Sequence, residues 1–209
     1  MKKLSASVLA LCLGIGSTVH AEPTTTRYIQ KGKTVSGTAD ISDPTGCLHG
    51  LMGISASDET TKDENGATTM RILTGGMGGF DSCLETNFGV QGPQDVPLTI
   101  PLDQLSYTFN VRFLVHSVST KEGDGNDPGQ DLIFTATVTV TATSDLEKSR
   151  SSSVSKVGLT KIKMRSRGTT REAEVRVTNA KLGTQPIPFA VGTGEIGNMR
   201  KATIELTNL

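Results

Sequence analysis

Tryptophan is absent from this sequence of 209 residues, tyrosine occurs twice and histidine three times. Each shortage argues against a class of function. Without tryptophan, the chain lacks the usual aromatic platform on which carbohydrate-binding modules stack sugars. Its basic segments also lack the interleaved aromatic residues that favour single-stranded nucleic acid. Two tyrosines cannot supply the aromatic girdles of an outer-membrane barrel. We therefore expect neither nucleic acid as the partner nor a membrane-spanning barrel as the fold.

Catalytic motifs are also missing. The chain contains no Gly-x-Ser-x-Gly and no His-Glu-x-x-His sequence, which mark common hydrolases and zinc proteases. A glycine-rich run, Gly75–Gly79, lacks the Gly-Lys-Ser/Thr sequence that holds phosphate in nucleotide-binding loops, so we interpret it as a flexible loop. These absences favour a non-enzymatic protein. The alternative is a secreted hydrolase that uses dispersed carboxylates, because two carboxylates can cleave a glycosidic bond without any local motif.

The N-terminus has the three parts of a secretory signal peptide. Lys2 and Lys3 provide the positive start, residues 4–16 form an uncharged apolar stretch, and Val19-His20-Ala21 ends in the small residues that signal peptidase requires. We predict cleavage after residue 21 and a secreted or periplasmic protein. The apolar stretch is too short to span a bilayer, so no transmembrane segment is expected.

Two of the three cysteines lie outside this leader. Cys12 could be the lipidated residue of a lipoprotein signal, but Leu11 precedes it where a small residue is expected. Cys47 and Cys83 are then an isolated pair in an oxidising compartment, which predicts one disulfide; two buried free thiols are the alternative. The sequence has no Cys-x-x-Cys spacing that would indicate a zinc site.

Alternation of apolar and polar residues is the strongest structural signal. Apolar residues occupy the odd positions from Leu105 to Val115 and then the even positions from Leu132 to Ala142. Successive strand residues face opposite sides of a sheet, so each segment buries one face. The two segments are separated by a loop over 121–130 that is rich in glycine, aspartate and asparagine. They predict the two arms of a long antiparallel hairpin.

Further short strands are predicted near 48–54, 68–73, 84–90, 96–100, 157–164, 173–177 and 202–206, and Asn65-Gly66 predicts a hairpin turn. The apolar parity changes between Val157 and Met164, which indicates a bulge or a crossing between sheets. No stretch of useful length has a helical period. We therefore predict an all-β protein with one domain over 22–209: a single antiparallel β-sandwich of immunoglobulin-like or jelly-roll type, with a small β-barrel as the alternative.

The loop between the arms of the long hairpin contains oxygen ligands on a backbone punctuated by glycines. Such an arrangement suits calcium, and the candidate ligands are Glu122, Asp124, Asn126, Asp127 and Asp131. Pro128 stands where another ligand would be expected, and no glutamate closes the loop. An ordinary solvated turn, which uses the same residue types, is the alternative. No other cofactor is indicated.

Charge is distributed unevenly along the chain. Between 40 and 103, ten acidic residues accompany two basic ones, whereas between 145 and 181 ten basic residues accompany four acidic ones. Four of the basic residues share one parity and would line one face of an extended strand: Lys161, Lys163, Arg165 and Arg167. This ridge could bind an anionic polymer such as an acidic polysaccharide. The alternative is the solvated face of a strand in which lysines oppose aggregation.

These observations together predict an exported, non-enzymatic protein with a binding or structural role at the cell surface or in the periplasm. The partner would be an anionic polysaccharide or another protein. A self-associating structural protein, in which the acidic half of one copy meets the basic half of the next, is a further alternative. Salt-sensitive oligomers would distinguish it.

Overall fold

The computed structural model describes residues 24–90, 94–120 and 129–208, and every regular element in these ranges is a β-strand. The prediction of an all-β fold is confirmed. The predicted signal peptide and its cleavage site lie outside the described residues. Within the described ranges, no helix has the length and apolar character needed to cross a membrane.

The described residues form eleven strands of one antiparallel sheet, and five of these strands are unusually long. The strands are β1 (Thr25–Ser42), β2 (Leu48–Asp63), β3 (Gly66–Asp81), β4 (Thr86–Gly89), β5 (Gln94–Pro97), β6 (Ser106–Ser119), β7 (Gln130–Ala142), β8 (Glu147–Val157), β9 (Thr160–Leu182), β10 (Gln185–Ile187) and β11 (Ala190–Asn208).

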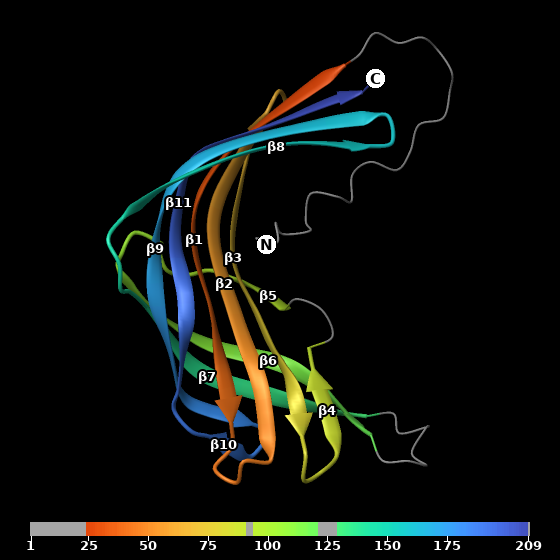
Figure 1. Cartoon of the computed structure of the whole chain (residues 1–209), viewed down its shortest axis with the longest axis vertical. Coiled ribbons are helices and arrows are strands. Elements are labelled where there is room, and N and C mark those ends of the chain that lie inside the picture. Colours follow the sequence, from red (N-terminus) through yellow and green to blue (C-terminus); the bar gives the residue numbers. More distant parts are fainter. Residues whose placement is uncertain (1–23, 91–93, 121–128, 209) are drawn as a thin grey trace.

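The strand pairings return to their starting point. From β9 they run through β11, β1, β2, β3, β4, β6 and β7, and β7 pairs with β9 again. In Figure 1, β6 and β7 cross behind the lower parts of β1, β2 and β3, so two layers of the same sheet enclose the core. Packed layers are the feature expected of a sandwich, and continuous pairing around them is the feature expected of a barrel.

The long hairpin predicted from alternation is confirmed. β6 and β7 pair without interruption from Ser106 opposite Thr141 to Ser117 opposite Gln130. The predicted turn at Asn65-Gly66 is also found, between β2 and β3. The first strand, Thr25–Ser42, was not predicted, because glycine and small residues interrupt its apolar positions.

Two local predictions were wrong. The parity change near residue 160 is neither a bulge nor a crossing, because β8 and β9 form a hairpin whose turn holds Gly158 at a φ of 58°. The run Gly75–Gly79 is part of β3 and pairs with β2 throughout, so it is not a flexible loop. A Cβ atom on Gly75 would lie 2.2 Å from Cζ of Phe113. Glycine is therefore needed there for the two layers to pack closely.

The core occupies only one half of the molecule. Its residues come from the lower parts of the long strands and from β6 and β7; among the largest fully buried side chains are Val35, Met52, Val115, Phe134, Val138 and Val175. The β8–β9 hairpin over 147–170 contributes nothing to this cluster. In Figure 1 this hairpin extends across the top of the molecule, beyond the layers that enclose the core. The upper sheet therefore presents side chains that the fold itself does not need for its core.

Candidate anion-binding face

The basic ridge predicted from the sequence lies on β9. Lys161, Lys163, Arg165 and Arg167 all belong to this strand, at alternating positions, and therefore share one face of the sheet. Three of the four side chains are exposed and Lys163 is half-buried. Their placement on one face is as the alternation predicted.

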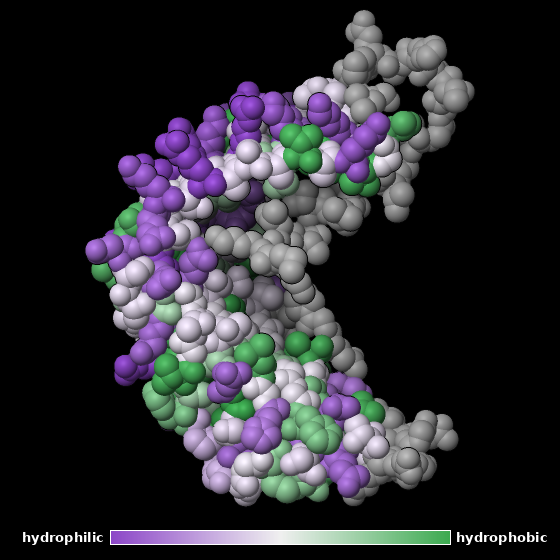
Figure 2. Space-filling view, viewed as in Figure 1, coloured by the Kyte–Doolittle hydropathy of each residue, from purple (hydrophilic) through white to green (hydrophobic). Residues whose placement is uncertain are grey.

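Neighbouring strands add further cations to the same face. Residues that lie directly opposite each other in an antiparallel pair project to the same side, and the register therefore identifies the members. We call the following eleven residues the basic face: Arg27, Lys31, Lys62, Lys148, Arg150, Lys156, Lys161, Lys163, Arg165, Arg167 and Lys201. Figure 2 shows hydrophilic side chains gathered along the upper rim of the molecule, over the region of β8, β9 and β11.

Like charges meet directly across the strands of this face. Arg150 lies opposite Arg167, and Arg167 lies opposite Lys201 on its other side. Lys156 likewise lies opposite Lys161. Like charges in such positions destabilise a sheet. The face therefore has a concentrated positive charge that intramolecular folding does not explain.

Few acidic residues offset this charge. Glu205 lies 3.7 Å from Lys163, measured from Oε2 to Nζ. Asp58 projects to the same side of the sheet and binds Arg71 at 3.1 Å. Among the salt bridges found in the described part of the chain, none involves Arg150, Arg167 or Lys201.

The opposite face of the same hairpin is nearly uncharged. Serines occupy 149, 151, 153 and 155 on β8, and they pair with Gly168, Ser166, Met164 and Ile162 on β9. The hairpin therefore has one strongly basic side and one side of mostly serine and apolar residues. A strand that was simply solvated would not require this segregation of charge.

The predicted disulfide between Cys47 and Cys83 is confirmed, with Cα atoms 5.4 Å apart. It joins the two segments at the open end of the β2–β3 hairpin. Two aspartates hold these segments: Oδ1 of Asp43 accepts hydrogen bonds from the backbone N–H groups of Cys47 and Leu48. Oδ1 of Asp81 accepts from those of Cys83 and Leu84. The role of both carboxylates here is structural.

Hydrogen bonding also controls the charge of Asp43. Its carboxylate accepts from the hydroxyl of Thr45, the backbone of Leu48 and Cys47, and Nε2 of Gln185 at 2.9 Å. These hydrogen bonds outweigh the effect of burial and lower the pKa of Asp43 to about 2. Glu59 shows the opposite behaviour, because burial raises its pKa although Gln30 donates a hydrogen bond to it.

Only one of the five predicted calcium ligands lies among the described residues. Glu122, Asp124, Asn126 and Asp127 lie outside the described residues. Asp131 is described, and its Oδ1 lies 2.8 Å from Nδ1 of His116. No group of three or more metal-binding side chains occurs among the residues that the structure describes. The calcium site stays a prediction.

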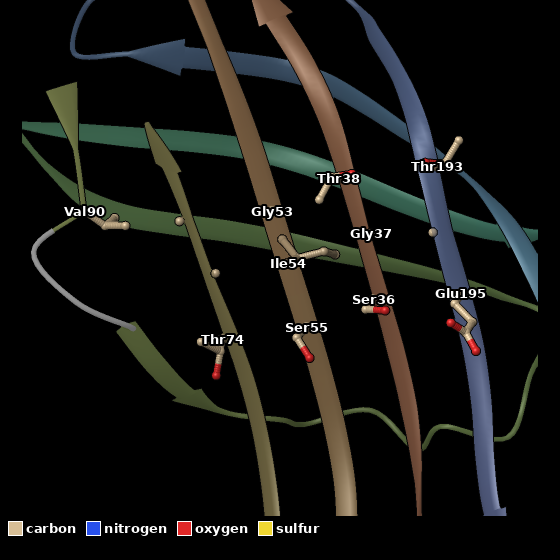
Figure 3. Close-up of a pocket in the computed structure, with 13 residues that line it drawn as sticks. Ser36, Gly37, Thr38, Gly53, Ile54, Ser55, Thr74, Val90, Thr193 and Glu195 are labelled. Atoms are coloured by element: carbon tan, nitrogen blue, oxygen red, sulfur yellow. The ribbon is translucent and has the colours of Figure 1, made fainter. Parts of the chain in front are cut away.

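A cavity of about 610 Å³, larger than the two others considered below, lies over the middle of the sheet. Figure 3 shows small side chains around it, among them Ser36 from β1, Ser55 from β2 and Thr74 from β3. Glu195 on β11 is its one carboxylate. A second cavity, of about 200 Å³, contains Asp103 as its one carboxylate. Neither brings together the carboxylate pair that glycoside hydrolysis requires.

The cations on strands other than β9 were missed as members of the site. The position of those on β8 follows from the turn at Gly158, since a two-residue turn places Lys156 opposite Lys161 and Arg150 opposite Arg167. The glycine between two alternating segments was the signal that could have predicted this hairpin.

Comparisons with protein-family models, with curated proteins and with solved structures find no match for this chain. The function must therefore be argued from the site.

Proposed function

We propose that this is an exported, non-enzymatic binding protein whose basic face binds an anionic polysaccharide at the cell surface or in the periplasm. The row formed by Arg150, Arg167 and Lys201 carries the proposal. Three adjacent cations repel one another in the free protein. A bound polyanion would attract all three and so offset that repulsion.

The shape of the face suits a polymer better than a small molecule. The cations of β9 from Lys161 to Arg167 are spread over seven residues of one strand, which corresponds to roughly 20 Å at the usual rise of a strand. Cations on β8 and β11 widen this stripe on both sides. A repeating anion can contact many of them at once, and release of its counterions favours binding.

A polysaccharide is favoured over nucleic acid by the composition of the face. Among the described residues, the positions paired with its cations hold no aromatic side chain, and Tyr28, next to Arg27 on β1, projects to the other side of the sheet. Bases stack on aromatic side chains in most single-strand binders, whereas sulfate and carboxylate groups of a polysaccharide need only cations. The cavities that hold Glu195 and Asp103 contain one carboxylate each, which supports a binding role over hydrolysis.

Binding of residues 22–209 to a sulfated polysaccharide, a polyuronate and a neutral glucan tests the proposal. We expect both anionic polymers to bind and the neutral glucan not to bind. Replacing Lys161, Arg165 and Arg167 together by glutamine should weaken binding about tenfold or more. Equal replacement of Lys181, Arg112 and Arg176, which lie outside the basic face, is the matched control. Binding to single-stranded DNA but to neither polysaccharide would refute the proposed ligand.

A further inference from the structure

A small cavity lies at one end of the basic face, where β8 and β9 meet β11. Its volume is about 370 Å³. Four cations line it, namely Lys148, Arg150, Arg167 and Arg200, together with Thr169. None of its lining residues is acidic. It differs from the rest of the basic face because its cations surround a hollow and do not simply project from a strand.

Local backbone structure creates this hollow. Between Met199 and Lys201 the register of β11 shifts against β9, and Arg200 is the residue that has no partner of its own in the ladder. A bulge of this kind re-aims a side chain. Gly168 lies opposite Met199, and a Cβ atom there would lie 2.5 Å from the carbonyl oxygen of Asn198. Glycine is therefore required for the two strands to approach at the bulge.

The four cations have no charged partner within the molecule as described. The salt bridges of the described residues include none of Lys148, Arg150, Arg167 and Arg200. Three of the four are arginines, whose planar groups donate paired hydrogen bonds to oxyanions. Convergent donors with high positive charge and a nearby hydroxyl match a small anion that has several oxygens.

We propose that this cavity binds a phosphate or sulfate monoester group of the polysaccharide. That a polysaccharide carries this group rests on the proposed function. That the cavity binds a tetrahedral oxyanion does not. A tetrahedral oxyanion offers three free oxygens to three guanidinium groups, whereas a carboxylate offers two oxygens in one plane. The basic face then supplies general attraction, and the cavity selects the esterified sugar.

Titration of residues 22–209 with inorganic phosphate, sulfate and acetate at equal ionic strength tests the chemistry. Phosphate and sulfate should bind at least about tenfold more tightly than acetate, because the arginines pair with more oxygens. Arg200→Gln should weaken the binding of both about tenfold, and Arg200→Lys should restore part of it. The matched control is Arg112→Gln, which removes an exposed arginine on β6, outside the basic face, and should leave phosphate affinity unchanged. Circular dichroism checks that each variant retains its strands.

Three outcomes would overturn the inference. Acetate could bind as tightly as phosphate, Arg200→Gln could weaken phosphate binding no more than Arg112→Gln does, or neither oxyanion could bind. Binding to vesicles that contain phosphatidic acid is measured as well, because a lipid headgroup could supply the same phosphate. If they bind through Arg200 while phosphorylated polysaccharides do not, the polysaccharide is the wrong carrier.

The two proposals fail in different ways. Loss of polymer binding together with retained, Arg200-dependent phosphate binding would refute the proposed function and leave the oxyanion site in place. Polymer binding that Arg200→Gln leaves unchanged, with no binding of phosphate, would refute the oxyanion site alone.

Discussion

Arg150 and Arg167 lie directly opposite each other on β8 and β9, and their side chains share the exposed face of the hairpin. A pair of this kind lowers the stability of the free protein, since like charges on directly opposite residues repel each other. The protein keeps the pair at a place that contributes nothing to the core. A bound anion between the two guanidinium groups would remove this repulsion, which is the reason that we propose for the pair.

Arg150→Glu should stabilise the protein and weaken polymer binding at the same time. The substitution replaces a repulsive cross-strand pair by an attractive one, which is worth about 0.2–1 kcal/mol. Urea unfolding at low salt measures the gain, and it should shrink at high salt because exposed charge pairs are screened.

Ser153→Glu is the control for this prediction. It places a glutamate on β8 as well, but on the opposite face, where Met164 is the partner. It should therefore not stabilise the protein, and it should weaken polymer binding less than Arg150→Glu does. If Arg150→Glu left polymer affinity unchanged, Arg150 would not belong to the binding face.

Gly75→Ala should destabilise the protein, because the added Cβ would lie 2.2 Å from Cζ of Phe113 in the facing layer. Overpacking of this kind costs about 1–3 kcal/mol. The thermal midpoint and the urea midpoint should both fall. Gly89→Ala is the matched control, since no heavy atom outside its chain neighbours lies within 4 Å of that Cβ. Equal stability of the two variants would show that the layers do not pack as closely as described.

Loss of the disulfide should lower stability strongly. Cys47 and Cys83 are separated by 36 positions, and closing a loop of that size stabilises a protein by about 3–4 kcal/mol in the chain-entropy model. Urea unfolding of the oxidised protein, the reduced protein and the double variant Cys47→Ala/Cys83→Ala measures the loss. The last two should agree with each other. An oxidised protein no more stable than either of them would contradict the prediction.

Asp43→Asn should destabilise the protein at neutral pH, with an effect that disappears in acid. The pKa of Asp43 is lowered to about 2 by hydrogen bonds, so its stabilisation is complete above the unfolded-state value of about 3.9 and is lost as the pH falls toward 2. Unfolding midpoints of both proteins between about pH 7 and pH 2 should therefore converge in acid. Asp40→Asn, at an exposed position of β1, is the control. A constant difference between Asp43→Asn and the unchanged protein at every pH would show that the carboxylate charge is not involved.

Alternation predicted the strands that bury one face and expose the other. β6 and β7 are such strands, and both were found where the apolar positions placed them. β1 was missed because Gly37 lies in the middle of its buried face. Gly75–Gly79 was misread for the same reason, since glycine in sequence signals flexibility but here allows the layers to approach closely.

Only part of the basic face could be predicted from the sequence. The four cations from Lys161 to Arg167 occupy alternate positions, so the sequence of one strand was enough to place them on one face. The pairing of Arg150 with Arg167 required the register of a hairpin, and Lys201 required a partner strand from the far end of the chain. Long-range pairing of this kind is not encoded in local periodicity. The cavity at Arg200 depends on a bulge, which no sequence pattern indicated.

The salt dependence of binding to a sulfated polysaccharide shows whether the cations of the basic face hold the polymer. Residues 22–209 and the variant with glutamine at 161, 165 and 167 are titrated between about 50 and 500 mM salt. We expect the logarithm of the association constant to fall linearly with the logarithm of the salt concentration. The slope should be shallower for the variant, because fewer counterions are released. Equal slopes for both proteins, or an affinity that does not depend on salt, would contradict binding through the basic face.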